Sequence, residues 1–84
     1  MPTPTVSTSG RQSITTKYLP PTNSRGSRIK ATCEAGSVTI PFPYEHDVAR
    51  AHQAACEALL AKLGWFGRYV GGSVPRGYVF VEVV

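Results

Sequence analysis

Apolar and polar residues alternate with a period of two in three short segments of the first half of the chain. These segments are Ser13–Leu19, Arg28–Glu34 and Val38–Phe42. Such alternation is typical of strands that bury one face. Pro41 and Pro43 lack amide hydrogens, so we expect the third strand to lie at an edge of its sheet or to end early.

The longest periodic segment, Asp47–Leu63, has the spacing of a helix. Its apolar stripe consists of Val48, Ala51, Ala55, Leu59 and Leu63, with His52, Cys56 and Leu60 at its margins. Gly64 is well placed to end this helix. Two further apolar segments follow, Trp65–Val70 and Gly77–Val84, and we expect them to pair as a closing hairpin.

The order of three strands, a helix and two strands predicts an α+β fold. One helix must cover one face of a mostly antiparallel sheet of about five strands, because neither element buries its apolar side alone. The 84 residues suffice for a single domain, which we place at residues 12–84. Residues 1–11 are rich in Pro, Thr and Ser without periodicity, and we expect them to form a flexible tail.

The last strand has two different faces, and the choice between them decides what the open side of the sheet carries. We expect its valine face to pack under the helix, so that the buried set is Val79, Val81 and Val83 with Ile29, Ala31, Ile40 and Phe42. The open side then presents Lys17, Arg28, Lys30, Thr32, Tyr78 and Phe80. Cations neutralise phosphates and aromatic rings stack on bases, so this surface suits single-stranded nucleic acid. Alternatively, the two aromatic residues pack against the tail, each other or a second copy.

Two loops add further positive charge. Asn23–Arg28 combines small residues with Arg25 and Arg28, a combination that can hold a phosphate through amide and guanidinium groups. It lacks the P-loop pattern, and the alternative is a solvated loop whose arginines protect a strand edge. Gly71–Gly77 carries Arg76, and the sequence does not show whether the two loops lie at the same end of the sheet.

The net charge of the chain says more about its partner than about its fold. The formal net charge is +4, which favours an anionic partner, although small domains also carry such charge for solubility. No apolar run is long enough to span a membrane, and the first ten residues lack the charged and apolar regions of a signal peptide. We therefore expect a protein of the cytoplasm.

The titratable and nucleophilic residues form no recognisable catalytic pattern. Cys33, Cys56, His46 and His52 match no zinc-finger spacing, and the two cysteines are interpreted as small core residues rather than as a disulfide. The acidic residues are scattered and indicate no carboxylate pair. We expect a non-enzymatic protein without metal or cofactor.

One stretch also carries a resemblance. KYLPPTNSRGSRIKA at Lys17–Ala31, a helix rich in Ala and Leu, and GYVFVEV at Gly77–Val83 together resemble a family of small, mostly uncharacterised proteins encoded by bacteriophages. The resemblance covers Ile14 to Val83. It implies expression in the cytoplasm of a bacterial host cell during infection, as an accessory factor that binds nucleic acid or inhibits host defence in the manner of anti-CRISPR proteins. It brings no catalytic residues.

The leading hypothesis is a binding module for nucleic acid or a phosphorylated ligand. Its candidate residues are Lys17, Arg25, Arg28, Lys30, Arg76, Tyr78 and Phe80. The alternatives are a protein–protein inhibitor of a bacterial defence complex and a homodimeric structural protein.

Overall fold

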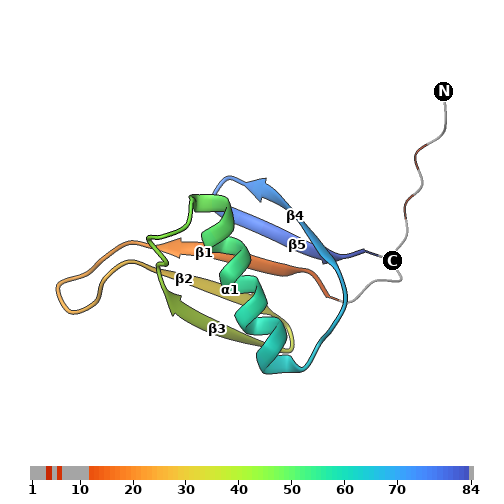
Figure 1. Cartoon of the computed structure of the whole chain (residues 1–84), viewed down its shortest axis with the longest axis horizontal. Coiled ribbons are helices and arrows are strands. Elements are labelled where there is room, and N and C mark those ends of the chain that lie inside the picture. Colours follow the sequence, from red (N-terminus) through yellow and green to blue (C-terminus); the bar gives the residue numbers. More distant parts are fainter. Residues whose placement is uncertain (1–3, 5, 7–11, 84) are drawn as a thin grey trace.

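The computed structural model describes residues 4, 6 and 12–83. The predicted flexible tail, residues 1–11, lies outside the described residues except for Pro4 and Val6. The elements along the chain are β1 (Ile14–Leu19), β2 (Arg28–Cys33), β3 (Gly36–Pro41), α1 (Val48–Leu63), β4 (Tyr69–Val74) and β5 (Gly77–Glu82). The predicted α+β fold is confirmed, since one helix lies on a single five-stranded sheet with only antiparallel ladders (Figure 1).

The strand order is β3-β2-β1-β5-β4, so the first strand is the centre of the sheet. β1 pairs with β2 on one side and with β5 on the other. The helix crosses one face diagonally and links the two edge strands, β3 and β4 (Figure 1). It packs mainly on β3, β2 and β1, and none of the described elements covers the other face of the sheet. Within the described residues, no helix has the length and apolar character needed to cross a membrane.

β3 lies at an edge of the sheet, as its prolines predicted. The amide of Phe42 donates to the carbonyl of Ser27 (3.0 Å), so Phe42 points its backbone groups towards β2. Because backbone groups alternate along a strand, Pro41 and Ser37 point theirs outwards. Pro41 has no hydrogen to offer there, and the Lys62 ammonium donates to the carbonyl of Ser37 (2.8 Å). This edge is therefore largely blocked.

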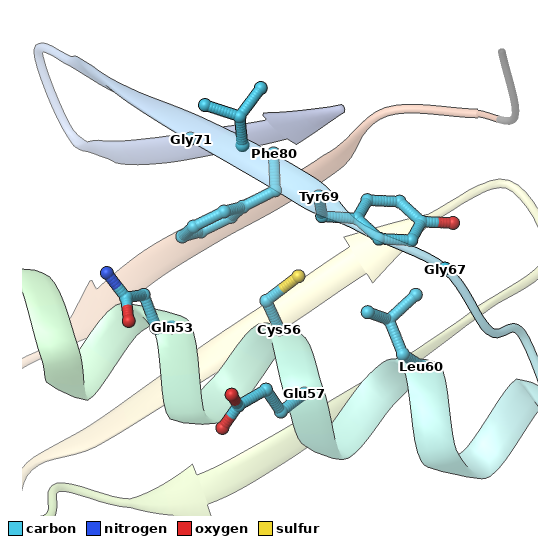
Figure 2. A pocket seen from close by; sticks show the side chains of 9 residues that line it. Gln53, Cys56, Glu57, Leu60, Gly67, Tyr69, Gly71 and Phe80 are labelled. Atoms are coloured by element: carbon cyan, nitrogen blue, oxygen red, sulfur yellow. The ribbon is translucent and has the colours of Figure 1, made fainter. Parts of the chain in front are cut away.

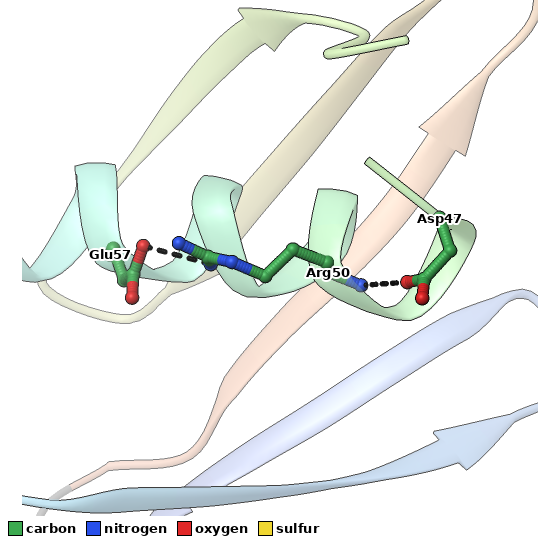
Figure 3. A network of polar contacts seen from close by, with 3 residues as sticks. All are labelled: Asp47, Arg50 and Glu57. Carbon is green, nitrogen blue, oxygen red and sulfur yellow. Dashed lines mark hydrogen bonds and ion pairs between the residues drawn. The ribbon is translucent and has the colours of Figure 1, made fainter. Parts of the chain in front are cut away.

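The helix begins and ends with specific caps. The Asp47 carboxylate accepts a hydrogen bond from the Arg50 amide (2.8 Å), as expected for an N-cap. The Arg50 guanidinium reaches along the helix to Glu57 at 3.1 Å (Figure 3). At the other end Gly64 has φ 70°, the left-handed conformation that glycine adopts without a steric cost, and it ends the helix where the sequence predicted.

The core lies between α1 and the central strands. Its buried apolar residues are Ile14, Ile29, Ala31, Ala51, Ala55, Cys56, Leu59 and Phe80. The helix presents alanines to the sheet, so its backbone can approach closely. One polar pair is buried in this layer: the Thr16 Oγ1 and His52 Nδ1 atoms are 2.7 Å apart, and the ring of Tyr78 lies 4.9 Å from the imidazole.

The expectation that the valine face of β5 packs under the helix is wrong. β5 pairs with β1 so that Phe80 lies opposite Ile14 and Tyr78 opposite Thr16. Since Ile14 and Thr16 are buried under the helix, the two aromatic residues face it too, and Val81 turns to the open face with 42% of its surface exposed. The physical reason lies in β4, where the ring of Phe80 occupies the space that a side chain at Gly71 would need.

The closing hairpin is present, but its limits differ from the prediction. β4 begins at Tyr69 rather than Trp65, after Gly67 with φ 125°. Gly71 and Gly72, which were expected in the connection, are strand residues. The turn consists of Pro75 and Arg76 between the paired residues Val74 and Gly77.

Gly77 and Gly72 offer a matched test of this packing. A Cβ atom at Gly77 would collide with the backbone carbonyl of Thr16 in the central strand, whereas a Cβ at Gly72 meets no atom within 4 Å. We expect Gly77→Ala to lower the free energy of unfolding by about 1–3 kcal/mol, the usual cost of overpacking. Gly72→Ala should change it by less than about 0.5 kcal/mol. Urea denaturation of both variants measures the difference, and equal stabilities would contradict the β1–β5 packing.

The buried imidazole makes stability depend on pH. Burial lowers the pKa of His52 below its ordinary value of 6.5. The unfolded chain therefore binds a proton at a higher pH than the folded chain does, and stability should fall as pH drops below about 6.5, by at most about 1.4 kcal/mol per pH unit from this group.

Denaturation curves of His52→Gln should lose this slope between neutral and mildly acidic pH. His46→Gln, which removes the histidine in the loop before α1, is the matched control and should keep the slope. A wild-type slope that survives in His52→Gln would show that another group causes it.

Candidate nucleic-acid interface

Two lysines lie directly opposite each other on the open face of the sheet. Lys17 in β1 pairs with Lys30 in β2, and both side chains are exposed. Like charges at directly opposed positions of a sheet are unfavourable. Among the described residues, neither ammonium group has a hydrogen bond or an ion pair that would offset this repulsion. Both charges are therefore available to an anion.

Arg28 adds a third cation to the same face, and we call Lys17, Arg28 and Lys30 the basic patch. The Arg28 Nε donates to the carbonyl of Gly26 (3.3 Å), which holds the guanidinium at the base of the loop after β1. At the open-face positions of the described strands, every charged residue is a cation. Glu82, the one acidic residue in a strand, belongs to the helix side, two positions beyond Phe80. The strand positions of this face thus hold no acidic residue beside the basic patch.

The two arginine-bearing loops lie at the same end of the sheet. Gly77 pairs with Lys17, so the turn that holds Arg76 adjoins the end of β1, from which the loop with Arg25 extends. Figure 1 shows this β1–β2 loop reaching well beyond the helix. Arg25 and Arg76 are both exposed and lie beyond the same end of the basic patch.

Some of the backbone amides in and next to the Asn23–Arg28 loop are used within the loop itself. The Thr22 hydroxyl accepts hydrogen bonds from the amides of Ser24 (3.4 Å) and Arg25 (3.1 Å). The Thr22 amide in turn donates to the Arg25 carbonyl at 2.7 Å. Because these amides are used within the loop, they do not converge on an external phosphate. An anion at this loop would meet the guanidinium groups.

Tyr78 and Phe80 do not share a surface with the cations. β5 does lie beside β1, but the period of two along the strand places these rings on the helix side. Phe80 is only 5% exposed, and the two rings stack with centroids 6.2 Å apart. The predicted combination of cations and stacking rings on the open face is therefore wrong for these two residues.

Other aromatic residues, which the predicted site did not include, are exposed near the loop. Tyr18 packs edge-on against Phe42 at 5.9 Å, and Phe42 lies 4.9 Å from Tyr44. Tyr18 is 41% and Tyr44 75% exposed. Tyr18 shares the face of Ile14, so its side chain leaves the hairpin opposite to the basic patch. The alternation of residues in β1 already indicates that Tyr18 lies on the face of Ile14.

The open face is divided into a basic half and an apolar half. The basic patch occupies β1 and β2, whereas β4 and β5 present Val70, Val74, Val79 and Val81. Val70 is 56% and Val74 40% exposed. Backbone phosphates gain nothing from such side chains, so the apolar half calls for a different explanation.

A pocket of about 410 Å³ lies on the other side of the sheet, between α1 and β4 (Figure 2). Cys56 and Leu60 line it from the helix, and Tyr69 and Phe80 from the strands. Burial, with a smaller effect from the nearby Glu57 carboxylate, raises the pKa of the Cys56 thiol to about 11. The thiol is therefore protonated at neutral pH and is a poor nucleophile. Across the described residues there is no group of three side chains suited to hold a metal ion.

Comparison with known proteins finds no matching family model, no matching curated protein and no matching solved structure. The resemblance to small bacteriophage proteins stays a prediction from the sequence.

Proposed function

We propose that this protein is a non-enzymatic module that binds the sugar–phosphate backbone of nucleic acid. The basic patch would form the centre of the interface, with Arg25 and Arg76 extending it at one end. The observation that carries the proposal is the pair formed by Lys17 and Lys30, two like charges held face to face on an open sheet, where the described strand positions hold no acidic residue. A phosphate group between or beside them would turn this repulsion into attraction.

The same arrangement favours binding without sequence preference. Lysine and arginine neutralise phosphates and release counterions, a term that does not depend on the bases. Tyr78 and Phe80 point under the helix, so the described strands place no aromatic ring on this face for a base to stack on. Lysine side chains are long and flexible, which lets the two ammonium groups adjust to the phosphate spacing of different nucleic acids. We therefore expect both single strands and duplexes to bind.

The bacteriophage resemblance adds a setting to this proposal. In that setting the module would be an accessory factor made in an infected bacterial cell, with host or phage nucleic acid as its partner. The binding chemistry argued above does not depend on this setting.

Salt dependence tests the proposal. We expect affinity for a short DNA to fall steeply with salt, and the double variant Lys17→Gln, Lys30→Gln to flatten that dependence. Loss of two phosphate contacts should reduce the slope of log affinity against log salt by about 1.4 for a single strand and about 1.8 for a duplex. Fluorescence anisotropy titrations at several salt concentrations measure the slope.

The control removes the same charge from elsewhere on the molecule. Lys62→Gln, Arg68→Gln changes the helix end and the loop before β4, away from the basic patch. It should leave the slope nearly unchanged although the net charge falls equally. Equal slopes for both double variants would mean that the patch is not the interface, and no binding at low salt would refute the proposal.

A second candidate is an inhibitor that binds a protein of a bacterial defence complex. The observation that favours it is the exposed valine half of the open face, which adjoins the basic patch and suits a mixed acidic and apolar protein surface. A pull-down from bacterial lysate treated with nuclease separates the two candidates. If the protein binds nucleic acid, proteins captured through that nucleic acid should be lost after the treatment. A protein partner would remain after nuclease and would be lost on Val81→Asp.

A further inference from the structure

β4 is an edge strand with outward-pointing backbone groups. The amide of Val83 donates to the carbonyl of Arg68 (2.7 Å), so the backbone groups of Arg68 point towards β5. By the alternation of a strand, Val70, Gly72 and Val74 also point towards β5, whereas Gly71 and Ser73 point away from it. β4 ends the strand order, and within the described part of the chain no other strand pairs with it on that side.

Unlike β3, this edge has none of the usual protection. Its sequence, YVGGSV, contains no charge and no proline, and it forms a regular ladder with β5 over its full length. The helix packs over β3, β2 and β1 and leaves the β4 side uncovered (Figure 1). At the β3 edge, by contrast, Pro41 and the Lys62 ammonium occupy the outward positions. Regular, uncharged edge strands pair readily with another chain.

We propose that the β4 edge is a homodimer interface, in which two copies pair their β4 strands antiparallel about a two-fold axis at Gly71. Outward-pointing residues must meet outward-pointing residues in such a pair. With Gly71 opposite Gly71 of the other copy, Ser73 lies opposite Tyr69, and every such residue of β4 finds a matching partner. The two five-stranded sheets then continue into one sheet.

The lack of charge in β4 makes this strand better suited than the rest of the surface to pair with a second copy of itself. The chain has a net charge of +4, and any cation close to a two-fold axis would meet its own copy, but β4 carries none. Val70 comes to lie opposite Gly72 of the other copy, where the space around a Cβ position is empty to 4 Å. The valine half of each open face therefore joins that of the other copy.

The residues that flank β4 also complement each other under this symmetry. Phe66, 84% exposed, lies in the loop before β4, and Arg76 lies in the turn after it. Antiparallel pairing brings the start of one β4 beside the end of the other. The exposed ring then lies near a guanidinium group of the second copy, a favourable cation–π arrangement.

Light scattering of the full chain over a concentration series tests the proposal. We expect the mass to rise to twice that of one chain. Ser73→Pro removes an outward-pointing amide without touching the ladder to β5, and it should raise the dissociation constant at least about tenfold. Ser73→Thr keeps the amide and is the matched control. Val70→Lys places a charge beside the axis and should have the same effect as the proline, and circular dichroism confirms that each variant is folded.

Hydrogen exchange identifies the edge itself. In the dimer the amides of Gly71 and Ser73 should be protected, and this protection should be lost on dilution and in Val70→Lys. A mass of one chain at all concentrations would overturn the proposal and leave the edge to a different protein. So would a dimer whose Gly71 and Ser73 amides exchange freely, or one that both variants leave intact. Because these readouts contain no nucleic acid, they stand or fall separately from the proposed function.

Discussion

The register of the central strand determines both faces of this protein. β1 places Ile14 and Thr16 under the helix and, in the same step, Lys17 on the open face. A slip of one residue would bury the lysine and expose the isoleucine, so the register is strongly specified. Two further contacts fix the register of β1, one with the helix and one with β5. His52 meets the Thr16 hydroxyl from the helix, and Gly77 lets β5 approach the Thr16 carbonyl.

The same register explains why the candidate interface is basic and not aromatic. β5 pairs with β1 in a register that places Tyr78 opposite Thr16 and Phe80 opposite Ile14. The two aromatic side chains therefore lie on the same buried side of the sheet. Their large rings fill the layer beside a helix that presents mostly alanines, and a core this small needs that volume. The open face is left with the remaining alternate residues, which include three cations on β1 and β2 and two valines on β5. The division of the open face is thus a consequence of how the core is filled.

The sequence predicted the type and order of the elements because their signals are local, although the limits of β4 were wrong. Prolines placed β3 at an edge, and the helical period and Gly64 gave the limits of α1. The orientation of β5 was not predictable in this way, because both of its faces are apolar. Which face of β5 turns towards the helix depends on Gly71, a residue of β4 that leaves room for the ring of Phe80. Likewise, the common face of Lys17 and Lys30 follows from alternation, but their direct opposition needs the β1–β2 register.

The contrast between Gly71 and its neighbours bears on the unprotected edge. Gly71 is required by the core, since the Phe80 ring occupies its side-chain space, and the edge cannot be protected at that position. Val70 and Val74 are under no such constraint, because they lie on the open face and are 56% and 40% exposed. A lysine at either position would protect the edge at little cost to the fold. In an isolated domain these valines contribute only their contacts with β5, such as that of Val70 opposite Val81, whereas pairing of the edge with another chain would also bury their exposed surface.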